Sequence, residues 1–269
     1  MSRHWFRAPS TESVVVRAAA RAAAGRYTRP PIVDPSAGAA TGESVAALWS
    51  AVTRSATAVP PDTGAGPVID RETFAASPVV AGFEARARAE LVLRALARET
   101  NLLLPSTRFL LLGTGPVADA LAGSLTRLGA RLEIVAHDPA GLADFAHRYG
   151  VPVAATSERV PAEIDVVIAT GRDHPPFTPD AVAAAARPLV VIDAAPPDHP
   201  GIVLPAGESR GTVRNLTEFA GPRAVFVAPP PPPDALDRAT ADLRAVYAVL
   251  LVTVGPDRAD EELAEVLPA

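Results

Sequence analysis

The chain has 269 residues and a formal net charge of −5 at pH 7, a size that suits one large domain or one domain with a smaller companion. Its positive residues are scattered through a mildly acidic sequence, which argues against a nucleic-acid-binding surface. It contains no cysteine and no lysine, so disulfides, thiolate metal sites, cysteine nucleophiles and Schiff-base chemistry are excluded.

The sequence has no apolar stretch as long as a membrane span and no apolar signal core at its start. We therefore expect a cytoplasmic protein that does not bind membranes. The arginine-rich, acid-poor beginning leaves a transit peptide as the alternative. The five histidines are scattered without ligand spacing, so no metal site is predicted.

Two helices are expected near the N-terminus. The first, SVVVRAAARAAAG, stops at Gly25, a usual residue for a C-terminal cap. The second, TGESVAALWSAVTRSA, has Thr41 as its candidate N-cap and an apolar face. Residues 58–78 are dense in proline and glycine, which is typical of a linker or of the rim of a site. The stretch VAGFEARARAELVLRALARETN then predicts a long helix that leads to a strand.

Short apolar runs alternate with helical stretches from Phe109 onward. The runs are FLLLG, LEIVA, VPVAA, DVVIATG, PLVVIDA and AVFVA. Continuously apolar strands are typical of a parallel sheet buried on both faces. The sequence therefore predicts an α/β fold with a doubly wound, mostly parallel sheet and a small N-terminal helical segment.

The first strand of this sheet runs into a glycine-rich turn. Gly113, Thr114, Gly115, Pro116, Val117 and Ala118 follow the pattern G-x-G-x-x-A between a strand and a helix. In that pattern the first glycine permits a tight turn, the second lets the backbone approach a pyrophosphate, and the small last residue lets helix and strand pack closely. The turn predicts a dinucleotide site at the helix N-terminus. The alternative is that the glycines serve only the turn.

These elements predict three parts of the chain. Residues 1–78 form a helical or cap segment with a linker, residues 79–255 form a Rossmann-like dinucleotide-binding domain, and residues 256–269 form an acidic tail. The last helix of the domain, near residues 235–252, has an apolar stripe and follows five prolines. We expect that helix to pack on the sheet or to return to the N-terminal helices.

The end of the second strand leaves the choice between NAD and NADP open. Ala136 stands where an acid would bind the ribose hydroxyls of NAD, and its absence leaves room for a 2′-phosphate. Asp138 could still reach the ribose, or it could cap the next helix. His137 could stack on adenine or meet a phosphate.

Candidates for proton transfer follow later strands. Thr170 and Gly171 end one strand at the edge where open α/β sheets bind ligands, and His174 comes next. Asp193 ends the following strand. Asp198 and His199 follow Asp193 as weaker candidates, since DAAPPDHPG is equally typical of a surface loop, and Tyr27 is a further possible proton handler.

From about Gly66 to Leu216 the order of segments resembles the NAD-binding half of the adenosylhomocysteinases. The likeness lies in GPVID, ETNLLLPSTRFLLLGTGPVADAL, GARLEIVAHDP, IDVVIATG, PLVVIDAAPPD and GTVRNLTEF. The resemblance implies a cofactor-facing frame of Gly113, Gly115, Thr170 and Gly171. It also implies that Asn215 meets the nicotinamide amide.

The chain departs from that family at its catalytic residues. The family's lysine before the long helix is missing, and only Asp70 and Glu72 lie near its place. The strand-end glutamate is replaced by Ala136, DAAPPD lacks the family's cysteine and histidine, and the N-terminal part is too short for its substrate domain. Hydrolysis of adenosylhomocysteine is therefore not expected. Hydroxy-acid, shikimate and methylene-tetrahydrofolate dehydrogenases share the same half.

The sequence thus predicts an NAD(P)-binding oxidoreductase-like protein that moves a hydride to or from a small carbonyl, imine or alcohol substrate, with His174 or Asp193 handling protons. One alternative is a non-catalytic Rossmann protein that serves as a ligand sensor or partner subunit. A second is an adenosylmethionine-dependent methyltransferase, although RFLLLGTG lacks that fold's usual acid. The apolar last helix favours a homodimer or a partner chain.

Overall fold

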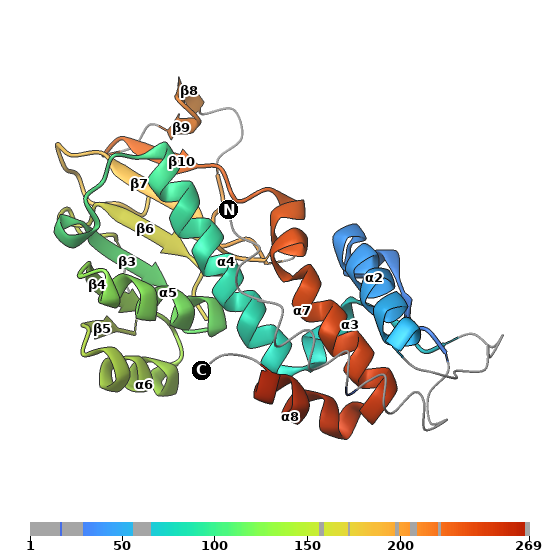
Figure 1. Cartoon of the computed structure of the whole chain (residues 1–269). Coiled ribbons are helices and arrows are strands. Elements are labelled where there is room, and N and C mark those ends of the chain that lie inside the picture. The colour runs from blue at the N-terminus through green and yellow to red at the C-terminus, as the bar shows by residue number, and fades with distance from the viewer. Residues whose placement is uncertain are drawn as a thin grey trace. The chain divides into compact units, whose positions relative to one another are not determined.

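The computed structural model describes residue 17 and residues 29–55, 66–155, 159–171, 173–196, 199–204, 209–219 and 222–266. The chain divides into two compact units, and Figure 1 shows its elements. The terminal unit comprises Met1–Glu84 and Pro233–Ala269, and the sheet unit comprises Ala85–Pro232. Apart from residue 17, the helix predicted to end at Gly25 lies outside the described residues. Tyr27 and Asp198 also lie outside them.

The sheet unit is built on an eight-stranded sheet in the order β5-β4-β3-β6-β7-β10-β9-β8. The first six strands of that order are parallel, whereas β9 and β8 run antiparallel at one edge. The strands are β3 (Arg108–Leu112), β4 (Arg131–Val135), β5 (Val153–Ala154), β6 (Val166–Ala169), β7 (Leu189–Asp193), β8 (Ser209–Val213), β9 (Leu216–Phe219) and β10 (Val225–Ala228). The parallel strands have the order 3-2-1-4-5-6 of the doubly wound dinucleotide-binding folds, so the expected α/β class is confirmed.

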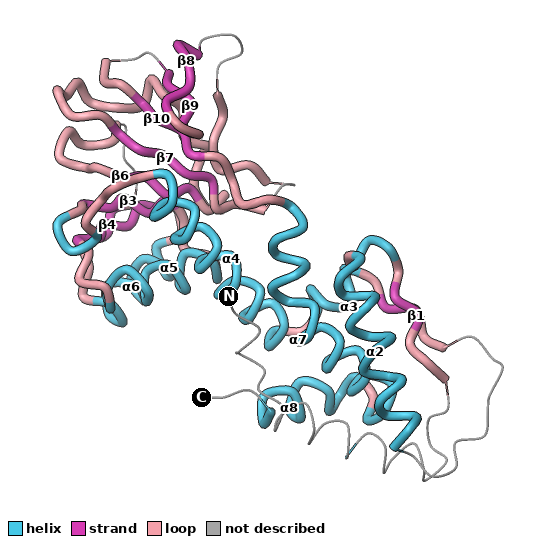
Figure 2. Tube along the Cα trace, turned by 45° about the horizontal axis from the view of Figure 1, so that its top comes forward, coloured by secondary structure: helices cyan, strands magenta, loops and turns pink. Residues whose placement is uncertain are grey.

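Two different kinds of cover bury the faces of this sheet. On one face lie the end of α4 (Pro78–Glu99) and the helices α5 (Pro116–Arg127) and α6 (Pro139–Tyr149), which share a core with alternate residues of β3 and β6 (Figure 2). On the other face the described chain is irregular, and Val160, Phe177 and Val182 pack against Leu110 and Leu112. The connections after β5 and β6 thus cover the sheet without helices in their described parts.

The terminal unit is mainly helical. It contains α2 (Ala39–Ser55), α3 (Arg71–Ala76), α7 (Pro233–Val254) and α8 (Pro256–Val266), with the short 3-10 turn η1 (Pro35–Ala37) and a parallel pair of β1 (Ile32–Val33) and β2 (Val68–Ile69). A second 3-10 turn, η2 (Leu104–Ser106), precedes β3 in the sheet unit. Among the described residues, no helix is both long enough and apolar enough to cross a membrane.

The two units differ from the division expected from the sequence. The apolar stripe of α7 packs against α2, so the last helix groups with the N-terminal residues and not with the sheet. Residues 256–266, expected as a tail, form α8, because Ala259 and Leu263 are buried in the same core. Within the expected linker, β2 and α3 form, and Asp70 caps α3 through the amide of Thr73.

The start of α2 also differs from the expectation. The helix begins at Ala39, two residues before the expected N-cap Thr41. Its first amides are capped from α7, because the carboxylate of Asp237 accepts hydrogen bonds from the Ala40 and Thr41 N–H groups at 2.9 and 3.2 Å. A cap supplied by a residue nearly two hundred positions away leaves no local sequence signal.

Candidate functional site

The glycine-rich turn joins β3 to α5 at the carboxyl edge of the sheet. Gly113 has φ +109°, a left-handed conformation that favours glycine, and its N–H donates to the Val135 carbonyl at 2.8 Å. Gly115 is the N-cap of α5, with φ −71° and ψ 179°, which any residue can adopt. Ala118, in the first turn of α5, is fully buried. Backbone conformation therefore explains the first glycine but not the second.

The N-terminus of α5 has backbone N–H groups that can donate hydrogen bonds to an anion. No side chain of the described residues caps it, and Pro116 at its first position has no N–H to donate. The amide groups that follow Pro116 and the positive end of the helix dipole would favour a phosphate there. The sequence-predicted residues Thr114, Pro116 and Val117 all lie in this turn. The geometry fits a pyrophosphate.

The end of β4 places no carboxylate at the predicted ribose position. Ala136 is buried, and its N–H donates to the Ala154 carbonyl at 3.2 Å. Asp138 caps α6, because its side chain accepts hydrogen bonds from the Ala140 and Gly141 N–H groups at 3.1 and 3.0 Å. Asp138 therefore caps α6, which was one of the two roles that the sequence allowed. A ribose would have to compete with these amides for the Asp138 carboxylate.

Two histidines meet beside this strand end. The rings of His137 and His174 stack with their centroids 5.8 Å apart and their planes at 22°. Nδ1 of His174 lies 2.5 Å from the Pro175 carbonyl oxygen. Burial lowers the pKa of His174 below its usual value, partly opposed by the hydrogen bond to Pro175 and assisted by the nearby His137. The lowered pKa favours the neutral form of His174, which can accept a proton.

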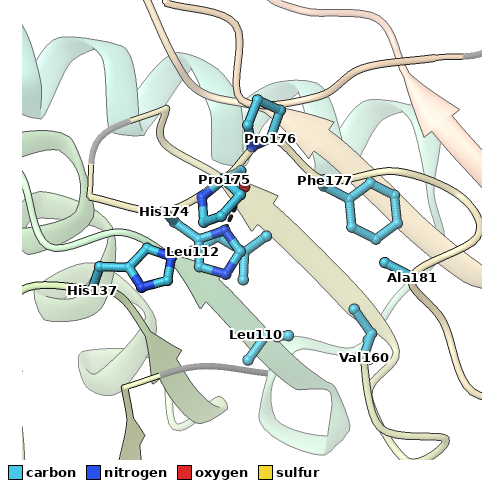
Figure 3. Close-up of a pocket in the computed structure, with 9 residues that line it drawn as sticks. All are labelled: Leu110, Leu112, His137, Val160, His174, Pro175, Pro176, Phe177 and Ala181. Carbon is cyan, nitrogen blue, oxygen red and sulfur yellow. Dashed lines mark hydrogen bonds between the residues drawn. The ribbon is translucent and has the colours of Figure 1, made fainter. Parts of the chain in front are cut away.

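The histidine pair borders a small cavity of about 140 Å³ (Figure 3). Its other walls are apolar: Leu110, Leu112, Val160, Pro175, Pro176, Phe177 and Ala181. Leu110 and Leu112 come from β3, and the rest come from the connections on the irregular face of the sheet. A flat, mostly apolar ring suits such walls better than a charged group does.

The end of β6, at Thr170 and Gly171, packs tightly against β3 and against the connection after β7. The Thr170 hydroxyl donates to the Leu112 carbonyl at 2.8 Å and is buried, so it points back to β3. Gly171 has φ +73°, and a Cβ there would lie 2.2 Å from the His199 carbonyl oxygen. The connection after β7 therefore packs directly on the end of β6. A ligand at this point would contact both connections.

Asp193, the second candidate for proton transfer, ends β7 and is partly buried. Its carboxylate accepts hydrogen bonds from the Ala195 N–H at 2.9 Å and the Gly201 N–H at 3.1 Å. Burial raises the pKa of Asp193, while these amides act in the opposite direction. The described structure has no hydrogen bond between Asp193 and His174, so it does not bring the two candidates together as a pair. Asp193 organises the connection that follows it.

Asn215 and His199 lie apart from the histidine cavity. Asn215 follows Arg214 in the turn of the β8–β9 hairpin, and its Nδ2 donates to the Glu99 carboxylate at 2.8 Å. His199 is exposed. Asp173, which sequence reasoning did not single out, accepts hydrogen bonds from both His137 and Thr114. Its backbone conformation, with φ +59°, leaves no pattern in the sequence.

A comparison with protein families matches this same region. The family described as "NADP oxidoreductase coenzyme F420-dependent" is similar to residues 108–197, which run from β3 to the connection after β7. The sheet unit has a Rossmann-type fold. No curated protein matches the chain.

Solved structures also share features with this chain. An L-alanine dehydrogenase aligns with a TM-score of 0.48 and 21% identity over 84% of this chain and 69% of that one. A dipicolinate synthase chain from Bacillus halodurans aligns with a TM-score of 0.44 and 16% identity over 77% of this chain. The corresponding dipicolinate synthase chain from Bacillus subtilis gives 0.44 and 14% over 82%. The chain spans 62% of the length of each of these two synthase chains.

Proposed function

We propose that the sheet unit binds NAD or NADP across the carboxyl ends of β3, β4 and β6, and that the protein is an oxidoreductase acting on a small carbonyl, imine or alcohol substrate. Gly113, Gly115 and the first turn of α5 hold the pyrophosphate. His137 and Asp138 face the adenosine half of the cofactor, and Thr170 and Gly171 face the nicotinamide half. The family match over residues 108–197 supports the cofactor class.

The conformation of Gly115 carries this proposal. With φ −71° and ψ 179°, the position does not need glycine for the backbone to turn. A glycine there is explained when a ligand's phosphate must come close to the main chain. The N-terminus of α5 supports the same interpretation, because its amides have no side-chain acceptor in the part of the chain that the structure describes.

The bound nicotinamide would supply the hydride chemistry. The protein's own residues would orient the cofactor and the substrate and exclude water. His174, whose pKa burial lowers, would hold or release the proton that accompanies hydride transfer. Asp193 is the second candidate for this proton, although its carboxylate already accepts two backbone N–H groups. The likeness of Asn215 to the adenosylhomocysteinase asparagine also remains a proposal, since its amide is engaged with Glu99.

One observation favours the alternative of a non-catalytic sensor or partner chain. The connections after β6 and β7 meet so closely at Gly171 that a single added carbon would clash with the His199 carbonyl. This packing narrows the space expected for a nicotinamide ring and its substrate. In this alternative the site binds a dinucleotide without turnover.

A turnover assay separates the two. Purified protein is mixed with NADH or NADPH and a panel of small ketones, ketoacids and imines, or with NAD⁺ or NADP⁺ and a panel of small alcohols, and nicotinamide absorbance is followed. Oxidation of the cofactor that depends on one of these substrates supports the oxidoreductase. Dinucleotide binding without turnover in either direction supports the sensor or partner chain.

The variant Gly115→Ala tests the site itself. The backbone tolerates alanine at this position, so the fold should persist by circular dichroism while dinucleotide affinity falls at least about tenfold. Gly123→Ala, in the same helix, is the matched control. Its Cβ would meet the Tyr149 hydroxyl at an ordinary 3.5 Å, so affinity should not change. Equal affinities in both variants would contradict the assignment of Gly115.

A further inference from the structure

Asp173 and His174, which together we name the strap, connect two other elements of the sheet unit. The Asp173 carbonyl accepts a hydrogen bond from the His137 N–H at 2.6 Å. The Asp173 carboxylate accepts one from the Thr114 hydroxyl at 3.5 Å. The His174 ring stacks on the ring of His137. The strap therefore holds both the glycine-rich turn and the end of β4.

The order of the strands dictates where the strap runs. In the sheet, β3 lies between β4 and β6. The strap follows β6, and His137 follows β4. A residue that leaves β6 and bonds to the end of β4 must pass across the end of β3, where the glycine-rich turn begins. This crossing lies at the topological switch point, where open α/β sheets bind their ligands.

We propose that the strap closes the dinucleotide cleft of the free protein and must release Thr114 and His137 before a dinucleotide can bind. This proposal rests on the proposed function of the same cleft. It assigns to Asp173 control of dinucleotide affinity, a role distinct from that of any cofactor-binding residue.

The charge of Asp173 opposes the expected ligand. Its carboxylate lies beside Thr114, the middle residue of the turn that should receive a pyrophosphate. Like charges at such a separation repel one another even at an exposed position such as Asp173, where water weakens the repulsion. The closed strap and the bound phosphates therefore compete for the same position.

The backbone of Asp173 is suited to a segment with two arrangements. Its φ of +59° lies in the left-handed region, which few residues other than glycine adopt, although Asp and Asn tolerate it best. The contacts to His137 and Thr114 hold this conformation. Once they are released, the residue can return to an ordinary backbone conformation, which favours opening.

The variant Asp173→Asn isolates the charge. Asparagine keeps the left-handed preference and a side-chain oxygen that accepts from Thr114, but it removes the negative charge. Calorimetric titration with NAD⁺, NADH, NADP⁺ and NADPH should show binding about three- to tenfold tighter than that of the unmodified protein. Asp180→Asn is the control, since Asp180 is exposed on the same β6–β7 connection and should leave affinity unchanged.

A reversible lock tests whether the strap must move. The chain has no cysteine, so Thr114→Cys combined with Asp173→Cys introduces a single pair of thiols, and the loss of both free thiols on oxidation verifies that the disulfide has formed. The oxidised variant should lose dinucleotide binding, and reduction with dithiothreitol should restore it. Thr114→Cys alone, treated with the same oxidant, controls for the loss of the threonine hydroxyl.

The outcomes separate the two proposals. If the unmodified protein binds a dinucleotide, and the locked variant binds it as tightly when oxidised as when reduced, the strap proposal is wrong while the cleft assignment stands. Unchanged affinity in Asp173→Asn overturns the proposed role of its charge in the same way. If the unmodified protein and every variant fail to bind all four dinucleotides, the proposed function fails and the strap proposal fails with it.

Discussion

Asp237 of α7 caps the N-terminus of α2, and its contacts predict how much its removal lowers the free energy of unfolding. In addition to the Ala40 and Thr41 amides, the Asp237 carboxylate accepts the Thr41 hydroxyl at 2.7 Å. Thr41 is fully buried, and Arg244 lies 3.7 Å from the same carboxylate. The substitution Asp237→Ala removes all of these interactions at once.

The separate contributions add up to a measurable loss. Removing a helix N-cap costs about 1 kcal/mol, and losing an anion from a helix N-terminus costs about 0.5 kcal/mol more. A buried hydroxyl left without its acceptor adds about 1 to 2 kcal/mol. We therefore expect Asp237→Ala to lower the free energy of unfolding by about 3 kcal/mol, with the last term the largest.

Urea unfolding followed by tryptophan fluorescence measures this loss, because Trp49 is buried in the same helix, α2. Asp242→Ala is the matched control on the same helix. Asp242 is exposed, and among the described residues its carboxylate accepts a hydrogen bond from the hydroxyl of the partly buried Ser44, so its removal should cost less than about 0.5 kcal/mol. Equal losses in the two variants would refute the capping argument.

Three further changes have predictable effects. Arg223→Met should lower the free energy of unfolding of the sheet unit by about 3 kcal/mol, because the buried Arg223 donates to three backbone carbonyls where β6 and β7 begin. Urea unfolding measures this loss, and an unchanged midpoint would contradict it. Gly82→Ala, inside α4, should raise the free energy of unfolding by about 0.5 to 1 kcal/mol, since its Cβ would meet no atom within 4 Å; a lower melting temperature would count against it. Burial, and then the hydrogen bond to Asp119, raises the pKa of Tyr149 to about 12. The stability that this tyrosine contributes should therefore be complete below about pH 10 and lost as the pH rises toward 12. Absorbance titration of the unmodified protein against Tyr149→Phe checks the shift, and a Tyr149 that ionises near pH 10 would contradict it.

The strands were predictable because their chemistry is local. The strands β3, β4, β6 and β7 are largely buried, so their residues are mainly apolar, and the runs from FLLLG to AVFVA all coincide with strands. The turn at Gly113 was predictable for a similar reason, since a left-handed residue between strand and helix favours glycine. The class of the fold follows from these two signals.

Other features depend on residues far apart in the chain. The start of α2 is set by Asp237, and the place of α7 by its packing on α2. The β8–β9 hairpin has a register irregularity and no clean alternation of apolar and polar residues. Nothing in the order of residues revealed that Asp173 would cross the end of β3 to reach His137. Such contacts arise only when the topology is formed, so a sequence pattern cannot report them.

The central claim is that the cleft at the glycine-rich turn binds a nicotinamide dinucleotide. Calorimetric titration of purified, nucleotide-free protein with NAD⁺, NADH, NADP⁺, NADPH and adenosylmethionine tests it most directly. We expect at least one nicotinamide form to bind in the micromolar range and to bind more weakly to Gly115→Ala, and we expect no binding of adenosylmethionine. If none of the four nicotinamide forms binds, the claim is contradicted, and Gly113 and Gly115 serve only the fold.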